Sequence, residues 1–168
     1  MEPQDKFVVL LRHGIAEPHG TGEDDDARIL TKTGNRRMKQ IARGLAQYFP
    51  KAEVIHSSPL IRCIETAEWV EKAYGSAVVF RTTDALKPAA DVEDFQTLIK
   101  GIKARYIICV GHEPNLSTTM LALTRMHSGR EIALKKGGCY GLRLHADGSA
   151  HLDWMLPPRV LRKRNNAS

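Results

Sequence analysis

Aromatic residues, cysteines and long apolar runs are all scarce in this 168-residue chain. Phe, Trp and Tyr make up 6% and none is interleaved with basic residues, which argues against a base-stacking nucleic-acid surface. The three cysteines, Cys63, Cys109 and Cys139, include no CxxC pair, so neither a zinc site nor a disulfide framework is indicated. No apolar run approaches the roughly 20 residues that a membrane-spanning helix needs.

The overall composition is that of an ordinary globular protein. Hydrophobic residues make up 42% and charged residues 26%, and 168 residues suffice to bury a proper core. We therefore expect a single domain over 1–168, with 1–6 and 162–168 as flexible ends. The first six residues are polar and carry acids, unlike a signal peptide, which predicts a reducing, cytoplasmic location. In such a compartment Cys109, inside an apolar run, packs as a small hydrophobe.

Positive charge exceeds negative charge by 6 and is concentrated in two places. The C-terminal tail carries Arg159, Arg162, Lys163 and Arg164, and a predicted helix carries Arg36, Arg37 and Lys39. Both groups have two interpretations. They attract an acidic partner or a phosphorylated substrate, or they are a solvated tail and a solvated helix face.

Short apolar runs and turn signals alternate along the chain. The runs predict strands at 7–11, 53–56, 77–80 and 106–110, and an alternating pair at 138–144 and 151–154 is joined by a turn. Helices are predicted from the N-cap Thr31 to Gln47, from Ser58-Pro59 to Tyr74, over 92–102, and from Pro114 or Asn115 to Thr124. This order predicts a three-layer α/β/α sandwich, with a mostly parallel sheet and an antiparallel pair near the C-terminus.

An Arg-His-Gly triplet, Arg12-His13-Gly14, ends the first apolar run. Buried strands seldom end this way, because an Arg and a His removed from water need charged or hydrogen-bonding partners. Two later segments can supply them, Ser57-Ser58-Pro59-Leu60-Ile61-Arg62 and Val110-Gly111-His112-Glu113-Pro114. All three follow predicted strands, and the carboxyl ends of parallel strands form the edge where open α/β sheets bind ligands. We expect the three segments to form one pocket.

The residue types in this pocket suit phosphoryl transfer. His13 is the candidate nucleophile: one ring nitrogen must stay unprotonated, and a hydrogen bond from the other N–H to a backbone carbonyl near Gly14 would ensure this. Arg12 and Arg62 match phosphate oxygens as bidentate clamps, and His112 completes the donors as a cation held by the phosphate. Each alone has a structural interpretation, as a hydrogen-bonded strand-end His or a solvated Arg, but all four at one edge favour a site. No metal is required.

Three ordered motifs resemble the histidine phosphatase (phosphoglycerate mutase-like) superfamily. They are Leu11-Arg12-His13-Gly14, Ser57 to Arg62 followed by Glu65-Thr66-Ala67, and Val110 to Pro114. The short length, the GHEP form and the tail 154–161 are similar to the SixA group of protein phosphohistidine phosphatases. The resemblance implies that His13 is phosphorylated during turnover and that Arg12, Arg62 and His112 bind the phosphate. It also places Arg28 near the pocket, as a phosphate-binding residue or as a solvated loop arginine.

The sequence leaves open whether Glu113 is the general acid or whether the reaction uses no general acid. The resemblance to acid phosphatases, which use a carboxylate directly after the second histidine, implies that Glu113 protonates a leaving alkoxide, provided that its pKa is raised. Alternatively, Glu113 is a first-turn helix carboxylate stabilised by the helix dipole. A phosphohistidine substrate needs no acid, because its leaving imidazole departs neutral when the other nitrogen carries a proton.

The acidic run Glu23-Asp24-Asp25-Asp26 borders the predicted pocket. Four interpretations of this run are open. It is a solvated loop, it faces away from the pocket, it pairs with the basic helix at 36–39, or it selects a basic surface on a partner.

Taken together, the sequence predicts a phosphatase that uses a phosphohistidine intermediate and dephosphorylates phosphohistidine on a signalling or carrier protein. The alternatives are a phosphomonoesterase for a small phosphate ester, such as a sugar phosphate or nucleotide, and a non-catalytic phosphate-binding module. We expect no cofactor or metal and no nucleic-acid or membrane partner. The oligomeric state and the substrate's identity stay open.

Overall fold

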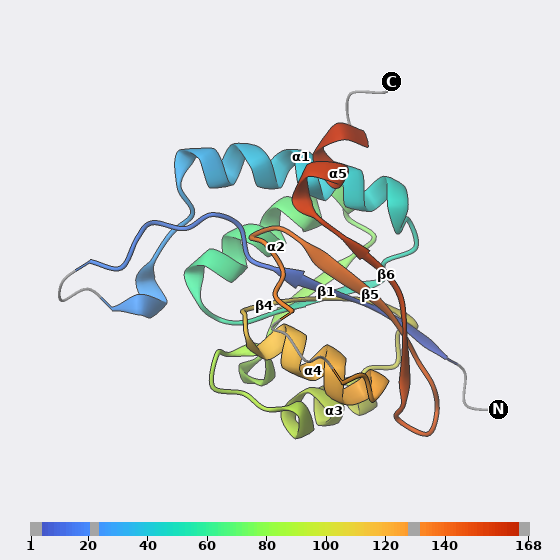
Figure 1. Cartoon of the computed structure of the whole chain (residues 1–168). Helices are drawn as coiled ribbons and strands as arrows, with labels where there is room; N and C mark the ends of the chain where they lie inside the picture. Colours follow the sequence, from blue (N-terminus) through green and yellow to red (C-terminus); the bar gives the residue numbers. More distant parts are fainter. Residues whose placement is uncertain (1–4, 21–23, 128–131, 165–168) are drawn as a thin grey trace.

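Six strands form one sheet whose spatial order differs from their order in the chain (Figure 1). The computed structural model describes residues 5–20, 24–127 and 132–164. The strands are β1 (Lys6–Arg12), β2 (Val54–Ser57), β3 (Val79–Thr82), β4 (Tyr106–Gly111), β5 (Cys139–Leu144) and β6 (Ala150–Leu156). Their order across the sheet is β3-β2-β4-β1-β5-β6. The first four strands pair in parallel, β5 pairs antiparallel with β1, and β6 pairs antiparallel with β5. The predicted mixed sheet is confirmed.

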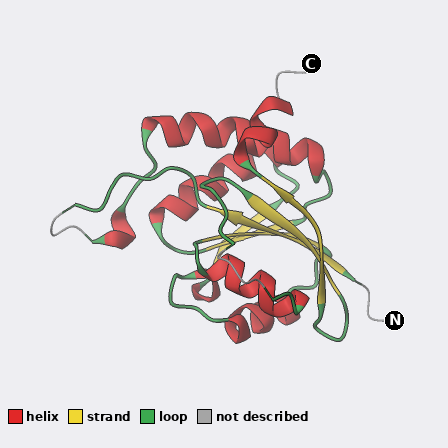
Figure 2. Ribbon diagram, in the orientation of Figure 1, coloured by secondary structure: helices red, strands yellow, loops and turns green. Residues whose placement is uncertain are grey.

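Helices cover both faces of the sheet, as Figure 2 shows with strands in yellow between helices in red. The helices are α1 (Lys32–Tyr48), α2 (Ile61–Tyr74), α3 (Val92–Gly101), α4 (Asn115–Thr124) and α5 (Pro158–Arg164), with 3-10 turns η1 (Asp25–Ala27) and η2 (Asp84–Leu86). One apolar core packs α1, α2 and α5 against one face, and a second packs α3 and α4 against the other. None of the helices in the described segments is long and apolar enough to cross a membrane.

Alternation along the central strands explains the two cores. Val9 and Leu11 of β1 enter the core under α1, whereas Val8 and Leu10 enter the core under α3 and α4, and all four are almost fully buried. A strand that is buried on both faces reads as a continuous apolar run, which is why β1 was predictable. Cys109 of β4 is buried as a small hydrophobe, as expected.

Helix α2 begins at Ile61, so the expectation that Ser58 caps a helix opened by Pro59 is wrong. The backbone N–H of Ser58 still donates to the Val110 carbonyl of β4 at 2.9 Å, which keeps the chain extended for one residue past β2. The N-cap is Leu60, which makes no side-chain capping bond. The Ser58 hydroxyl instead accepts from the Leu60 amide and is available to the site described below.

Regular structure reaches further into both ends than the sequence analysis expects. β1 begins at Lys6, whose ammonium donates to the carbonyls of Ile99 and Ile102. At the other end α5 runs from Pro158 to Arg164 and buries Leu161 against α1. A Cβ at Gly44 of α1 would lie only 2.0 Å from the Leu161 carbonyl oxygen, so glycine is what lets α5 approach α1 this closely.

Candidate active site

The predicted convergence of three segments at one sheet edge is confirmed. In the register of the parallel strands, Arg12 of β1 lies beside Gly111 of β4, and Ser57 of β2 lies beside Val110 of β4. The residues that follow, His13, Ser58 and His112, therefore leave the sheet at the same level. The rings of His13 and His112 lie with their centroids 5.3 Å apart.

His13 is buried and held in one ring orientation. Its Nδ1 lies 2.7 Å from the carbonyl oxygen of Gly14, so the Nδ1–H tautomer donates there and Nε2 keeps its lone pair. Its backbone N–H donates to the Gly111 carbonyl. Burial, reinforced by the charges of Arg62 and Arg12, lowers the pKa of His13 to about 3, although the Gly14 carbonyl opposes this. The imidazole is therefore neutral at pH 7, as an attacking nitrogen must be.

His112 is held by Ser58 and lies beside Arg62. Its Nε2 is 2.9 Å from the Ser58 hydroxyl, and its Nδ1 is 3.4 Å from Nη2 of Arg62. Burial and the charge of Arg62 lower the pKa of His112 to about 4. The protein's own groups therefore favour a neutral His112 at pH 7, although the charge of Asp25 opposes this. The expected cationic form would depend on a bound phosphate, whose charge would raise this pKa.

Arg12 and Arg62 each have one buried donor without a partner. The Nε atoms of both guanidiniums are buried and make no hydrogen bond within the described part of the chain. Other donors of both side chains are engaged within the chain: Nη1 of Arg12 donates to the Leu134 carbonyl, and both terminal nitrogens of Arg62 donate to Asp25. A buried N–H on a charged group is costly to leave unpaired, so these two atoms indicate where an acceptor would be bound.

Asp25 is a site residue that the sequence analysis missed. Its backbone carbonyl accepts from Nη1 of Arg62 at 2.7 Å, and its carboxylate accepts from Nη2 of Arg62 and from Nε of Arg28. The acidic run was expected to be solvated, to face away, or to pair with the basic helix or a partner. Asp25 instead turns inward, because two guanidiniums offset the cost of partly burying its charge. The Asp25–Arg28 spacing of three residues was the available signal.

Arg28 lies in the site rather than in a solvated loop. Its side chain is 12% exposed, and its Nη1 donates to the Glu17 carbonyl while its Nε donates to Asp25. Its partner Asp25 also binds Arg62, so Arg28 is linked to the first turn of α2. The structure therefore brings Arg28 together with the predicted cluster.

Glu113 precedes helix α4 rather than lying in its first turn, because α4 begins at Asn115 after the N-cap Pro114. The carboxylate still interacts with that turn through Ser117, and its Oε1 accepts from the Leu134 amide at 3.4 Å. Its Oε2 is buried and has no hydrogen-bond partner in the described segments. Burial raises the pKa of Glu113, the direction that a proton donor requires.

Helix α2 supplies two positioning side chains from the Glu65-Thr66-Ala67 motif. The Thr66 hydroxyl accepts from the Gly14 amide at 3.0 Å and donates to the Arg62 carbonyl at 2.7 Å. Glu65 accepts from the Leu30 amide and so fixes the far end of the Arg28 segment. One turn of α2 thereby connects the backbone that orients His13 with the residue that carries the second guanidinium.

The turn before β5 adds a further cation that was not predicted. The Gly137 amide donates to the carbonyls of both Arg12 and His13, a geometry that requires φ of 80° at Gly137. Lys136 therefore lies next to the nucleophile's backbone. Burial, and then the charges of Arg12, Arg28 and Arg62, lower the pKa of Lys136, which places its ammonium in their field.

Metal binding and catalysis by a cysteine nucleophile find less support. Among the described residues, no group of three or more His, Cys, Asp or Glu side chains is placed to hold a metal ion. Cys63 lies 3.4 Å from Nε2 of His112, but burial raises the pKa of its thiol to about 12. The thiolate is therefore absent at pH 7, and Cys63 does not compete with His13 as nucleophile.

Comparison with known proteins identifies the family of this chain. The family model for the histidine phosphatase superfamily (branch 1) matches residues 8–106, more than half of the chain. The chain belongs to the histidine phosphatase superfamily. A relative from Picosynechococcus sp., an uncharacterized protein, is 32% identical over 166 residues, covering 89% of this chain and 99% of the relative. Membership of the superfamily supports phosphatase activity.

Solved structures confirm the resemblance to SixA proteins within the histidine phosphatase superfamily. One, from Agrobacterium tumefaciens and described as phosphohistidine phosphatase SixA, is 25% identical with a TM-score of 0.77, over 91% of this chain and 98% of that chain. A protein histidine phosphatase SixA in complex with tungstate has a TM-score of 0.78 at 20% identity, over 92% and 99% of the two chains. The second comparison shows a shared fold.

Proposed function

We propose that this chain is a phosphatase in which His13 is transiently phosphorylated and whose substrate is phosphohistidine on a signalling or carrier protein. The observation that carries the proposal is a buried neutral imidazole set among guanidiniums with unsatisfied donors. Nδ1 of His13 is bound to Gly14, and the Nε atoms of Arg12 and Arg62 are buried without partners. A phosphoryl group would satisfy these donors while presenting phosphorus to Nε2 of His13.

The first step transfers the phosphoryl group to the enzyme. The lone pair on Nε2 of His13 attacks phosphorus, a new N–P bond forms, and the N–P bond of the substrate breaks. The leaving imidazole takes both electrons of that bond and departs neutral, because its other nitrogen already carries a proton. Arg12, Arg28 and Arg62 offset the charge of the phosphoryl oxygens throughout.

The second step returns the enzyme to its starting state. Water attacks phosphorus, the N–P bond to His13 breaks, and Nε2 recovers its lone pair as dihydrogen phosphate leaves. In this proposal the bound phosphoryl group raises the pKa of His112, which then takes up a proton at Nδ1 and donates it in a hydrogen bond to a phosphoryl oxygen. The Ser58 hydroxyl keeps the ring in place at Nε2.

The protonation state of Glu113 bears on the choice between phosphohistidine and phosphate ester substrates. An alkoxide leaving group needs a proton, and burial raises the pKa of Glu113, which favours the phosphomonoesterase alternative. The Leu134 amide donates to this carboxylate, and both Leu134 and Ser117 act to lower its pKa, which favours the ionised form and suits a substrate that needs no acid. SixA neighbours support the phosphohistidine substrate.

The test is a comparison of kcat/KM for a phosphorylated histidine-containing protein and for a panel of sugar phosphates and nucleotides. We expect the phosphoprotein to be turned over far faster, and Glu113→Gln to leave that rate within about threefold of wild type, since no general acid is used. Esters that are cleaved faster, with a loss of about 100-fold or more in Glu113→Gln, would establish the phosphomonoesterase instead. A His13→Ala variant serves as the control for contaminating phosphatases.

A further inference from the structure

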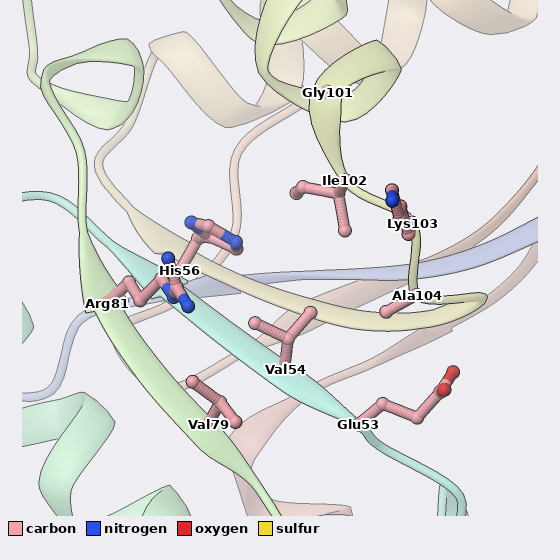
Figure 3. Close-up of a pocket in the computed structure, with 9 residues that line it drawn as sticks. All are labelled: Glu53, Val54, His56, Val79, Arg81, Gly101, Ile102, Lys103 and Ala104. Atoms are coloured by element: carbon pink, nitrogen blue, oxygen red, sulfur yellow. The ribbon is translucent and has the colours of Figure 1, made fainter.

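A second concave site lies away from the catalytic edge, on the sheet face that α3 and α4 cover, where α3 ends and leaves β2 and β3 open (Figure 3). Its volume is about 560 Å³, within the range of small-molecule sites. Its floor is formed by neighbouring residues of two parallel strands. In the register of β2 and β3, Val54 lies beside Val79 and His56 lies beside Arg81. The floor therefore has an apolar half and a polar half.

The polar half holds a buried ring nitrogen and an exposed guanidinium. His56 is only 8% exposed, and its Nδ1 is buried without a hydrogen-bond partner among the described residues. Arg81 is exposed and lies close enough to lower the pKa of His56, second to burial in that effect. In the described segments Arg81 has no carboxylate partner. Figure 3 shows the His56 ring and the Arg81 guanidinium reaching the same end of the pocket.

The apolar half can receive a short hydrocarbon chain. Val54 and Val79 form its floor, and Ile102 and Ala104, from the segment between α3 and β4, form the opposite wall. Val79 is 51% exposed, so much of its surface is available to be covered. Burial of a few methylene groups here contributes favourably to binding.

The charges around the pocket favour an anion. Lys103 lies on the rim and adds a second cation to Arg81. The one carboxylate that lines the pocket, from Glu53, lies at the end away from His56 and Arg81 in Figure 3. That carboxylate accepts from the backbone amides of Arg105 and Tyr106, so part of its charge is already used within the chain.

We propose that this pocket binds a small free carboxylate with a short aliphatic chain, its carboxylate between Arg81 and His56 and its chain over Val54 and Val79. A carboxylate matches the guanidinium fork with two oxygens, and the neutral imidazole adds one N–H donor. One guanidinium and apolar walls suit a monoanion better than a phosphate dianion. The site is distinct from the catalytic cluster and does not depend on the proposed function.

The test is titration of the whole chain with hexanoate, followed by calorimetry and by the NMR signals of the His56 ring. We expect saturable binding that shifts the His56 signals, with hexanamide and acetate each binding at least about tenfold more weakly because they lack the charge and the chain respectively. Arg81→Gln should weaken hexanoate binding by at least about tenfold. Arg37→Gln, an exposed cation on α1 across the sheet, is the matched control and should bind as wild type.

One further variant and one competition measurement separate this pocket from the catalytic site. Arg62→Ala should bind hexanoate as tightly as wild type, and inorganic phosphate should not compete. The proposal is overturned if hexanoate fails to saturate, if hexanamide binds equally well, or if Arg81→Gln is without effect. It is also overturned if Arg62→Ala, rather than Arg81→Gln, abolishes the binding, because the anion then occupies the catalytic cluster.

Discussion

Asp25 holds the guanidinium of Arg62 through two atoms, its backbone carbonyl at 2.7 Å from Nη1 and its carboxylate at 3.0 Å from Nη2. The same carboxylate accepts from Nε of Arg28 at 2.7 Å. One residue of η1 thus fixes two of the three arginines of the candidate site. Because Asp25 occupies the terminal nitrogens of Arg62, the unpaired Nε edge is left to face a phosphoryl group.

Replacing Asp25 tests this positioning role. We expect Asp25→Ala to lower kcat/KM roughly tenfold, because the charge-assisted hydrogen bonds of its carboxylate to Arg62 and Arg28 are lost. Asp25→Asn keeps an acceptor and should recover part of the loss. Asp26→Asn, an exposed acid on the same turn, is the matched control and should behave as wild type. Equal activity of Asp25→Ala and Asp26→Asn would show that Asp25 does not position the arginines.

The core of the site was predictable because its residues follow the chain's clearest strands. An apolar run that is buried on both faces stands out in a sequence, and parallel strands end at one edge, so Arg12, His13 and His112 had to lie near one another. The hydrogen bond from His13 to the Gly14 carbonyl followed from the chemistry, since a nucleophilic imidazole needs one nitrogen held as N–H.

Features that depend on long-range contacts were not predictable. The Asp25–Arg62 pair joins residues that are 37 positions apart in a loop and a helix, and no local pattern reports it. The late start of α2 depends on the bond from Ser58 to β4. Helix α5 was missed because its charges suggested a solvated tail, although Pro158 is a favourable first helical residue.

Thr66 is predicted to matter for both stability and activity. Thr66→Val keeps the shape of the side chain but removes the acceptor for the Gly14 amide and the donor to the Arg62 carbonyl. Leaving the buried Gly14 amide unpaired should lower the free energy of unfolding by about 1–3 kcal/mol, measured by urea denaturation. The kcat should also fall, since Gly14 orients His13. Thr118→Val, at an exposed position of α4, should leave both quantities unchanged.

The buried, neutral His13 should make stability depend on pH. Its pKa is about 3 in the folded chain, against an ordinary value of 6.5, so between these pH values the unfolded chain binds a proton that the folded chain does not. The free energy of unfolding should therefore fall as the pH falls, by about 1.4 kcal/mol per pH unit from this residue.

Urea denaturation at pH 4 to 7 measures this slope. His13→Asn removes the titrating group and should reduce the slope by about that amount, whereas His127→Asn, at an exposed position, should leave it unchanged. A slope that His13→Asn does not alter would mean that His13 takes up its proton over the same pH range in the folded and unfolded chain, which would contradict a lowered pKa.

Direct detection of the phosphoenzyme tests the central claim. Wild-type chain would be mixed with a radiolabelled phosphohistidine protein, quenched rapidly with alkali, and mapped by mass spectrometry. The account predicts an alkali-stable, acid-labile phosphoryl group on His13, and none in His13→Ala, which should still bind inorganic phosphate. Turnover that persists in His13→Ala, or a phosphoryl group on any other residue, would contradict it.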